Sequence, residues 1–111
     1  LKNMLIIPQV KPECDMCWHI YAIRVDLRMR DIVLNELKRK RIDAAFHFIP
    51  LHSSPYGRQI LGHTIPQLPI TDLVSKSLIR LPIYPQLTRK EQDYIINSLH
   101  TIFEKLGRKN G

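Results

Sequence analysis

The pattern of apolar and polar positions is clearest near the end of the chain, where it predicts a long helix. From Thr88 onward, apolar residues recur at the spacing of one helical face. Thr88 and Glu91 have the spacing of a capping box, in which each side chain bonds the backbone of the other residue at a helix start. Gly107 suits the position just past a helix end. The predicted apolar face consists of Tyr94, Ile95, Leu99, Ile102, Phe103 and Leu106.

The first half of the chain predicts a strand followed by a helix. The run from Ile20 to Val25 is rich in apolar, β-branched and aromatic residues, which is typical of a strand with a buried face. A helical stripe begins after Asp31, and Ile42 lies just past its end. Residues 1–18 are expected to be an irregular lead-in, of which Met4 to Ile7 can dock on the core. The stripe consists of Ile32, Val33, Leu34 and Leu37.

A second strand and a long loop are predicted next. The stretch from Ile42 to Phe48 is expected to be a strand that ends at Pro50, because proline has no N–H to give to a ladder. The proline-rich stretch from Pro50 to Pro69 is expected to be a loop. A long loop in a small domain is either functional or disordered, so this stretch is the first place to look for a site.

A short helix and a short extended segment complete the predicted elements. Thr71 is expected to cap a helix whose Leu73, Val74 and Leu78 point inward. Leu81 to Pro85 is expected to be extended and fixed by its prolines. The resulting order predicts an α+β fold, with a small sheet of about three strands, mainly antiparallel, packed with helices.

The composition fits one globular domain that occupies residues 1–111. Hydrophobic residues make up 44% and charged residues 24%, which is ordinary for a soluble chain. No apolar run approaches the roughly 18 residues that span a bilayer, so no membrane partner is expected. Because the chain does not start with Met, we expect it to continue upstream of Leu1.

The net charge of +7 invites anionic partners such as nucleic acid or another polyanion. The excess gathers in the run from Lys38 to Arg41 and in Arg108 and Lys109, where helices are predicted to end. Cations there meet the negative end of the helix dipole, so solvated helix ends are the simpler interpretation. A small basic module for nucleic acid or another polyanion is the alternative function, although low aromatic content makes nucleic acid the less favoured partner.

Cys14 and Cys17 have the Cys-x-x-Cys spacing of a zinc knuckle or a redox pair. A structural zinc site needs a second ligand pair, and the sequence has no other cysteine. We therefore predict no metal site and interpret the two as reduced cysteines of a cytoplasmic protein.

Three stretches, in this order, resemble the C-terminal part of DegT/StrS-type sugar aminotransferases. They are Trp18 to Val25, Phe46 to Pro55 and Leu81 to Thr88, and Arg30 with Asp31 also fits. The resemblance extends from about Ile7 to Phe103. The second stretch resembles the subgroup that makes 4-amino-4,6-dideoxy sugars on a thymidine diphosphate carrier, such as dTDP-4-amino-4,6-dideoxygalactose transaminases.

This resemblance implies the C-terminal small domain of a fold-type-I aminotransferase that uses pyridoxal phosphate. A lysine of a large domain upstream would hold that cofactor as a Schiff base, so no catalytic residue is expected in this chain. The amino group would pass from glutamate to a keto sugar nucleotide of the dTDP-4-keto-6-deoxyhexose type. The full-length protein would be a homodimer, and the isolated fragment inactive. The family usually has Gly at the position of Arg41, where a left-handed turn would end the first helix.

The same resemblance and the predicted loop indicate where substrate or cofactor would be contacted. His47 either touches such a ligand or caps the end of the predicted strand. The following polar residues either bind a diphosphate and sugar hydroxyls or form a turn that bonds its own backbone. Phe48 replaces the Tyr more common in the family and so lacks its hydroxyl. The predicted site residues are His47, Phe48, His52, Ser53, Ser54, Tyr56 and Arg58.

Overall fold

A computed structural model describes residues 3–109, apart from the side chain of Lys109. Its strands are β1 (Leu5–Ile6), β2 (Tyr21–Val25) and β3 (Leu78–Leu81). Its α-helices are α1 (Arg30–Arg39), α2 (Pro55–Leu61), α3 (Pro69–Ser77) and α4 (Arg89–Lys109), and its 3-10 turns are η1 (Leu51–Ser53) and η2 (Gly62–Thr64). Within these residues, no helix has both the length and the apolar character needed to cross a membrane.

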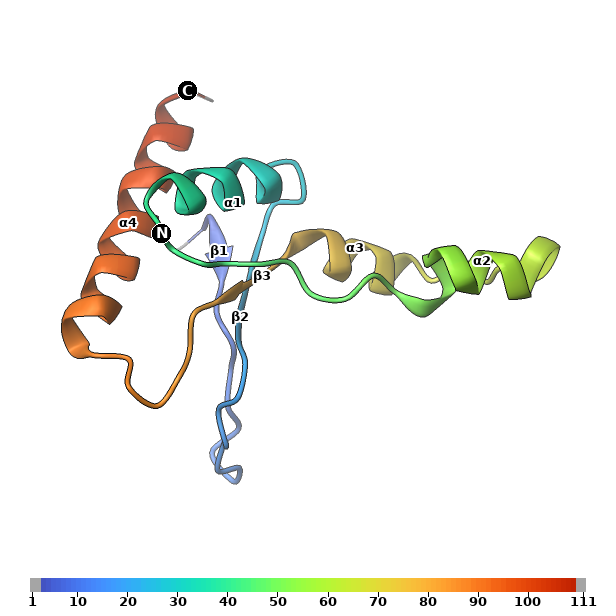
Figure 1. Cartoon of the computed structure of the whole chain (residues 1–111), viewed down its shortest axis with the longest axis horizontal. Helices are drawn as coiled ribbons and strands as arrows, with labels where there is room; N and C mark the ends of the chain where they lie inside the picture. Colours follow the sequence, from blue (N-terminus) through green and yellow to red (C-terminus); the bar gives the residue numbers. More distant parts are fainter. Residues whose placement is uncertain (1–2, 110–111) are drawn as a thin grey trace.

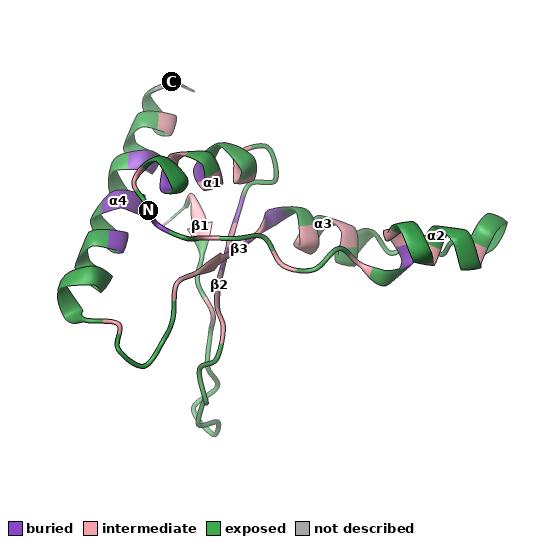
Figure 2. Cartoon of the chain, in the orientation of Figure 1, coloured by how far each residue is buried: buried purple, intermediate pink, exposed green. Residues whose placement is uncertain are grey.

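The three strands form an antiparallel sheet in the order β1-β2-β3, which confirms the predicted α+β fold. Ile23 of β2 faces Ile79 of β3, and both side chains are buried. Helices α1 and α4 and Ile42, just after α1, supply the rest of the core. Figure 2 shows buried patches on these two helices and on the sheet. The core consists of Ile23, Val25, Val33, Leu37, Ile42, Ile79, Ile95, Leu99, Ile102 and Phe103.

The capping box at the start of α4 is confirmed. The Thr88 N–H donates to Glu91 Oε2 at 2.8 Å, and the Glu91 N–H donates to Thr88 Oγ1 at 3.2 Å. The end of the helix differs from the prediction, because α4 continues through Gly107 to Lys109. Gly107 lies within the helix. An added Cβ there would be 3.9 Å from the Met4 side chain, which is an ordinary contact, so the site has room for a larger residue.

Helix α1 ends in a Schellman motif centred on Arg41. The Arg41 N–H donates to the Lys38 carbonyl at 2.9 Å, and the Ile42 N–H donates to the Leu37 carbonyl at 3.0 Å. Arg41 has φ of 58°, the left-handed conformation that glycine adopts at low cost. The turn that a glycine would form is therefore kept here by an arginine, and Leu37 and Ile42 close it with an apolar contact.

The predicted strand from Ile42 to Phe48 is wrong. Only Ala45 pairs there, in an isolated bridge to Arg80, and the third strand is β3. The chain leaves the sheet after this bridge, so the apolar residues that follow have no neighbouring strand. The predicted segment at Leu81 to Pro85 lies mostly after β3, because Pro82 and Pro85 lack the N–H that a ladder needs. Leu78 begins β3 and is not part of the preceding helix.

The predicted loop from Pro50 to Pro69 is also wrong, because it holds η1, α2 and η2. The prolines begin helices here: Pro55 opens α2, and Pro69 opens α3, two residues before the cap expected at Thr71. The first helical position tolerates proline because its N–H would be unpaired. In the predicted lead-in, Leu5 and Ile6 form a strand that pairs with β2. A strand of two residues is too short to produce a recognisable sequence pattern.

The molecule has a small body and two projections, as Figure 1 shows. One projection, the arm (residues 46–76), carries η1, α2, η2 and α3, and the other is the long connection between β1 and β2 (residues 7–20). The radius of gyration is 16.3 Å, whereas a compact domain of this length would have about 13 Å. The chain exposes 8951 Å², against about 6,400 Å² for a compact protein of the same mass.

Candidate functional site

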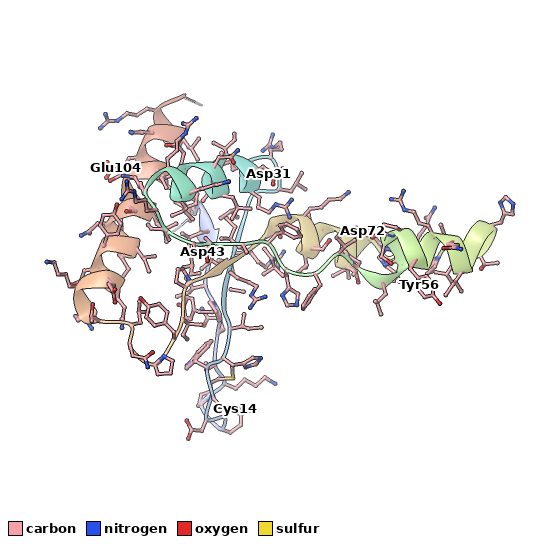
Figure 3. All side chains as sticks on the ribbon, in the orientation of Figure 1. Cys14, Asp31, Asp43, Tyr56, Asp72 and Glu104 are labelled. Atoms are coloured by element: carbon pink, nitrogen blue, oxygen red, sulfur yellow. The ribbon has the colours of Figure 1, made fainter. Side chains whose placement is uncertain are left out.

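An open groove of about 1260 Å³ runs along the arm. One wall consists of residues 46–50 together with 52, 53, 55 and 58, and the other consists of residues 65–69 together with 72, 75 and 76. Arg30 of α1 closes the end nearest the body. In Figure 3, Asp72 lies on α3 at the junction with η1 and α2, while Tyr56 projects from α2. The predicted site residues therefore divide between this groove and its outer surface.

His47 and Phe48 line the groove just after the chain leaves the sheet. The His47 ring lies edge-on to the Phe48 ring, with centroids 5.1 Å apart. His47 is half-buried, whereas Phe48 keeps 78% of its surface exposed. This places an imidazole and an aromatic ring together at an open surface, an arrangement suited to contacting a ring or hydroxyl of a bound molecule.

His52 is the one buried residue of the arm. Its Nε2 lies 2.9 Å from Asp72 Oδ1, across the groove from η1 to α3. An ionised carboxylate only accepts hydrogen bonds, so the Nε2–H of His52 donates to Asp72. His52 is thus already paired within the chain.

The two serines bond their own backbone. Ser54 caps α2, since its Oγ accepts from the Gly57 N–H at 2.9 Å and donates to the Leu51 carbonyl at 2.9 Å. Ser53 Oγ donates to the Pro50 carbonyl at 3.2 Å. Of the two readings of this segment, the polar turn describes the hydrogen bonds that the structure contains. Ser53 still lines the groove, and Ser54 does not.

Tyr56 and Arg58 both lie on α2 but face different surroundings. Arg58 lines the groove, where its guanidinium would meet an anion. Tyr56 is 70% exposed and lies outside the groove. The sequence placed these two residues together, and the helix separates them because neighbouring positions on a helix point in different directions.

Three charged residues of the groove were missed by the sequence interpretation: Arg30, Asp72 and Lys76. Arg30 Nη1 donates to the Ser75 carbonyl at 3.2 Å, and its guanidinium lies 5.6 Å from the Phe46 ring centroid. These groups come from α1 and α3, which no local pattern brings near His47. The groove lining therefore carries three cations, on Arg30, Arg58 and Lys76, and one carboxylate, which is paired with His52. The Arg30 guanidinium also pairs with the Asp31 carboxylate, at 2.9 Å, outside the lining.

In the turn before α1, the pKa of Asp26 is clearly lowered. The Arg28 side chain donates to both oxygens of Asp26, at 3.0 and 2.7 Å, and the Arg28 N–H donates at 2.8 Å. These hydrogen bonds lower the pKa of Asp26 to about 2. The shift belongs to an exposed turn that positions α1, and neither Asp26 nor Arg28 lines the groove.

Neither a cluster of metal-ligating side chains nor a buried lysine side chain occurs among the described residues. Between residues 3 and 109, no three His, Cys, Asp or Glu side chains gather to hold a metal ion, and Cys14 and Cys17 are exposed and free. Activated lysines lie in desolvated pockets. The lysine side chains described in residues 3–108 are all exposed or half-buried, and Lys76 is the one that lines the groove.

Known proteins match this chain over almost its whole length. An uncharacterized protein of Methanocaldococcus jannaschii is 31% identical over 102 residues, covering 88% of this chain and 26% of the relative. The aminotransferase TlmJ of Streptoalloteichus hindustanus has the same fold at a TM-score of 0.83 and 20% identity, covering 95% of this chain and 28% of TlmJ. NtdA of Bacillus subtilis, solved with bound cofactor PMP, matches at a TM-score of 0.79 and 22% identity, covering 93% of this chain and 24% of NtdA.

The chain thus spans about a quarter of the length of these relatives. A family model, that of the DegT/DnrJ/EryC1/StrS aminotransferase family, matches residues 1–100. With nearly the whole chain covered, and with the fold of two solved proteins reproduced, this chain belongs to the DegT/DnrJ/EryC1/StrS aminotransferase family.

Proposed function

We propose that this chain is the C-terminal small domain of an aminotransferase that uses pyridoxal phosphate and transfers an amino group from glutamate to a keto sugar nucleotide. The observation that carries the proposal is the groove of the arm, in which cations and an aromatic edge gather in a chain of this family. The bound PMP of NtdA supports the cofactor class. The resemblance of Phe46 to Pro55 supports a substrate of the dTDP-4-keto-6-deoxyhexose type.

The groove residues would bind and orient the sugar nucleotide. Arg30, Arg58 and Lys76 offer positive charge to a diphosphate, and a guanidinium can hold two phosphate oxygens at once. His47 and Phe48, which lie at the end of the same groove, would contact the sugar or the base. Closure of this wall over the reacting atoms would exclude water from them. The cofactor, held by the rest of the protein, would supply the electron sink.

The exposed apolar surface supports a large domain, or a second subunit of a homodimer, as the neighbour of the arm. Phe48, Leu51 and Ile70 each expose more than three quarters of their surface, at 78%, 86% and 77%. The solvent-accessible surface of the chain is 8951 Å², whereas a compact protein of this mass would expose about 6,400 Å². The difference is more than about 2,000 Å². Permanent interfaces bury about 2,000 Å² or more, counted over both partners. The excess of this one chain, shared between its two projections, is therefore large enough for its side of such an interface.

The two half-reactions of the full-length protein provide the test. We expect His47→Ala to slow transfer to the sugar nucleotide by about two- to tenfold, the effect of one lost hydrogen bond to an uncharged group. The glutamate half-reaction should change by much less, because His47 is assigned to the acceptor side. Equal losses in both half-reactions, or no loss in either, would reject the substrate-contact role. His100→Ala, on the exposed face of α4, is the matched control.

The absence of a cofactor anchor is tested on the chain alone. Mixed with pyridoxal phosphate and glutamate, it should give neither transamination nor the absorbance of an internal imine, because its described lysines lie in open surroundings. A stoichiometric imine at low cofactor concentration would contradict the assignment of the Schiff-base lysine to another part of the protein.

A further inference from the structure

The arm has no hydrophobic core of its own. Between residues 43 and 76, His52 is the single buried residue, with 9% of its surface exposed. Helix α2 and turn η2 bury no side chain. Because so few side chains of the arm are buried within this chain, polar contacts have a larger share in connecting η1 and α2 to α3 than they have in a packed core. The contact that spans these two segments is the hydrogen bond between His52 Nε2 and Asp72 Oδ1, at 2.9 Å.

On the His52 side, η1 and α2 are joined into one unit. The amides of Ser53 and Ser54 donate to the Pro50 carbonyl, at 3.1 and 2.9 Å, and Ser54 caps α2. Gly57 lies so close to η1 that an added Cβ would be 1.7 Å from the Leu51 carbonyl oxygen. Residues 50–61 therefore move together, and whatever fixes His52 fixes α2.

On the Asp72 side, α3 is tied to the body twice. Arg30 of α1 donates to the Ser75 carbonyl at 3.2 Å, and Arg24 Nε of β2 donates to Ser77 Oγ at 3.4 Å. Ser75 Oγ in turn donates to the Asp72 carbonyl at 3.0 Å. A continuous set of contacts thus runs from the sheet and α1, through α3, to Asp72 and His52.

We propose that His52 and Asp72 are positioning residues, which join the two walls of the groove and set the distance between them. This proposal goes beyond contact with a ligand: His52 acts through the unit that it holds, residues 50–61, which carries Arg58. The opposite wall carries Lys76. If the pair opens, these groups no longer face a common ligand at one spacing, although the core of the body is untouched because none of it lies in the arm.

Amide hydrogen exchange of the full-length protein tests the pairing without any reference to activity. In His52→Ala and in Asp72→Ala, exchange of residues 51–61 should rise by about tenfold, the equivalent of one charged hydrogen bond. The double variant should rise no further, because both changes remove the same interaction. Asp72→Asn keeps an oxygen acceptor of the same size and should restore most of the protection. Unchanged exchange in residues 51–61, or additive effects in the double variant, would overturn the proposal.

The kinetic consequence rests on the proposed function and is measured separately. For the sugar-nucleotide acceptor, both alanine variants should raise KM by about tenfold, with a smaller change in kcat and in the glutamate half-reaction. Asp72→Asn should return KM toward that of the unaltered protein. If the unaltered protein has no transaminase activity, the proposed function fails while the exchange result still decides the pairing. If exchange rises and KM does not, the pair holds the arm but does not position the site, and the proposal fails. Asp43→Asn and His100→Ala, which are exposed and outside the groove, are the controls.

Discussion

Leu37 and Ile42 meet at the end of α1, where the Ile42 amide donates to the Leu37 carbonyl at 3.0 Å and both side chains are buried. The bond requires the residue before Ile42 to adopt a left-handed conformation, and that residue is Arg41, with φ of 58°. This conformation strains a residue that has a Cβ. The first prediction follows from that strain.

Replacing Arg41 with Gly should stabilise the chain by about 1 kcal/mol, because glycine adopts positive φ without a Cβ clash. Urea unfolding followed by circular dichroism measures the change. Lys40→Gly is the matched control, since Lys40 has φ of −86° and gains nothing from glycine. That control should lose about 0.5–1 kcal/mol through the greater freedom of the unfolded chain. A loss of stability in Arg41→Gly would show that the arginine side chain contributes more than the backbone strain costs.

Replacing Gly57 with Ala should loosen the arm, because the new Cβ would lie 1.7 Å from the Leu51 carbonyl oxygen. Backbone atoms cannot rotate away as a flexible side chain does, so η1 and α2 must separate. We expect a local cost of about 1–3 kcal/mol, as for other overpacked sites. Amide exchange of residues 51–61 measures it. Gln59→Ala, at an exposed position of α2, should leave exchange unchanged or slower, and equal exchange in both variants would refute the close approach.

The start of α4 should show a defined dependence on pH. The Thr88 N–H, and less strongly its hydroxyl, donate to the Glu91 carboxylate and lower the pKa of Glu91. A lowered pKa in the folded state means that this stabilisation is complete above the ordinary pKa of Glu. It is lost as the pH falls through the lower, folded pKa. Carbon-13 NMR titration of Glu91 should therefore show a midpoint below that of an unpaired glutamate.

Thr88→Ala tests the same cap by mutation. It removes the hydroxyl and should cost about 1 kcal/mol at neutral pH. It should raise the Glu91 pKa only part of the way, because the backbone N–H at residue 88 still donates. Thr101→Ala is the control, since the Thr101 hydroxyl bonds the Asn97 carbonyl inside α4 and not at its start. An unchanged Glu91 midpoint in Thr88→Ala would contradict a role for the hydroxyl.

The apolar surface of the arm should make the isolated chain self-associate. Phe48 and Leu51 are 78% and 86% exposed, and burying such a side chain stabilises a contact by about 1.5–3 kcal/mol. Phe48→Ser combined with Leu51→Ser should lower dye binding and raise the concentration at which sedimentation detects oligomers. Ile96→Ser, on α4 and 50% exposed, is the control outside the arm. If Ile96→Ser reduces self-association more than the double variant does, the arm is not the surface through which the chain associates.

Local signals predicted the body of this protein well. The Thr88–Glu91 box and the strand near Tyr21–Val25 depend on neighbouring residues and on one buried face, so the sequence pattern carried them. The stretch from Ile42 to Phe48 has the same apolar character, but a strand also needs a partner, and only Ala45 has one. The prolines were misleading because Pro55 and Pro69 begin helices. Whether a proline ends or starts a helix depends on the cap before it, such as Ser54.

The groove was only half predictable. His47, Phe48, His52, Ser53 and Arg58 follow one another in the chain, so the resemblance of a single stretch indicated that wall. Asp72 and Arg30 reach the same groove from α3 and α1, and their approach depends on how the arm folds back on the body. No periodicity within either helix carries that information.

The bridge between Ala45 and Arg80 has a consequence for how this family can diversify. The amide of each residue donates to the carbonyl of the other, at 3.1 and 2.7 Å, so a backbone bridge closes the arm where the chain leaves and re-enters the body. Closing a longer excursion costs only about 0.6 kcal/mol for each doubling of its length. Insertions, deletions and grafts between residues 46 and 76 should therefore leave the folding of the body almost unaffected. Recognition can then evolve on one segment while the scaffold that presents it stays the same.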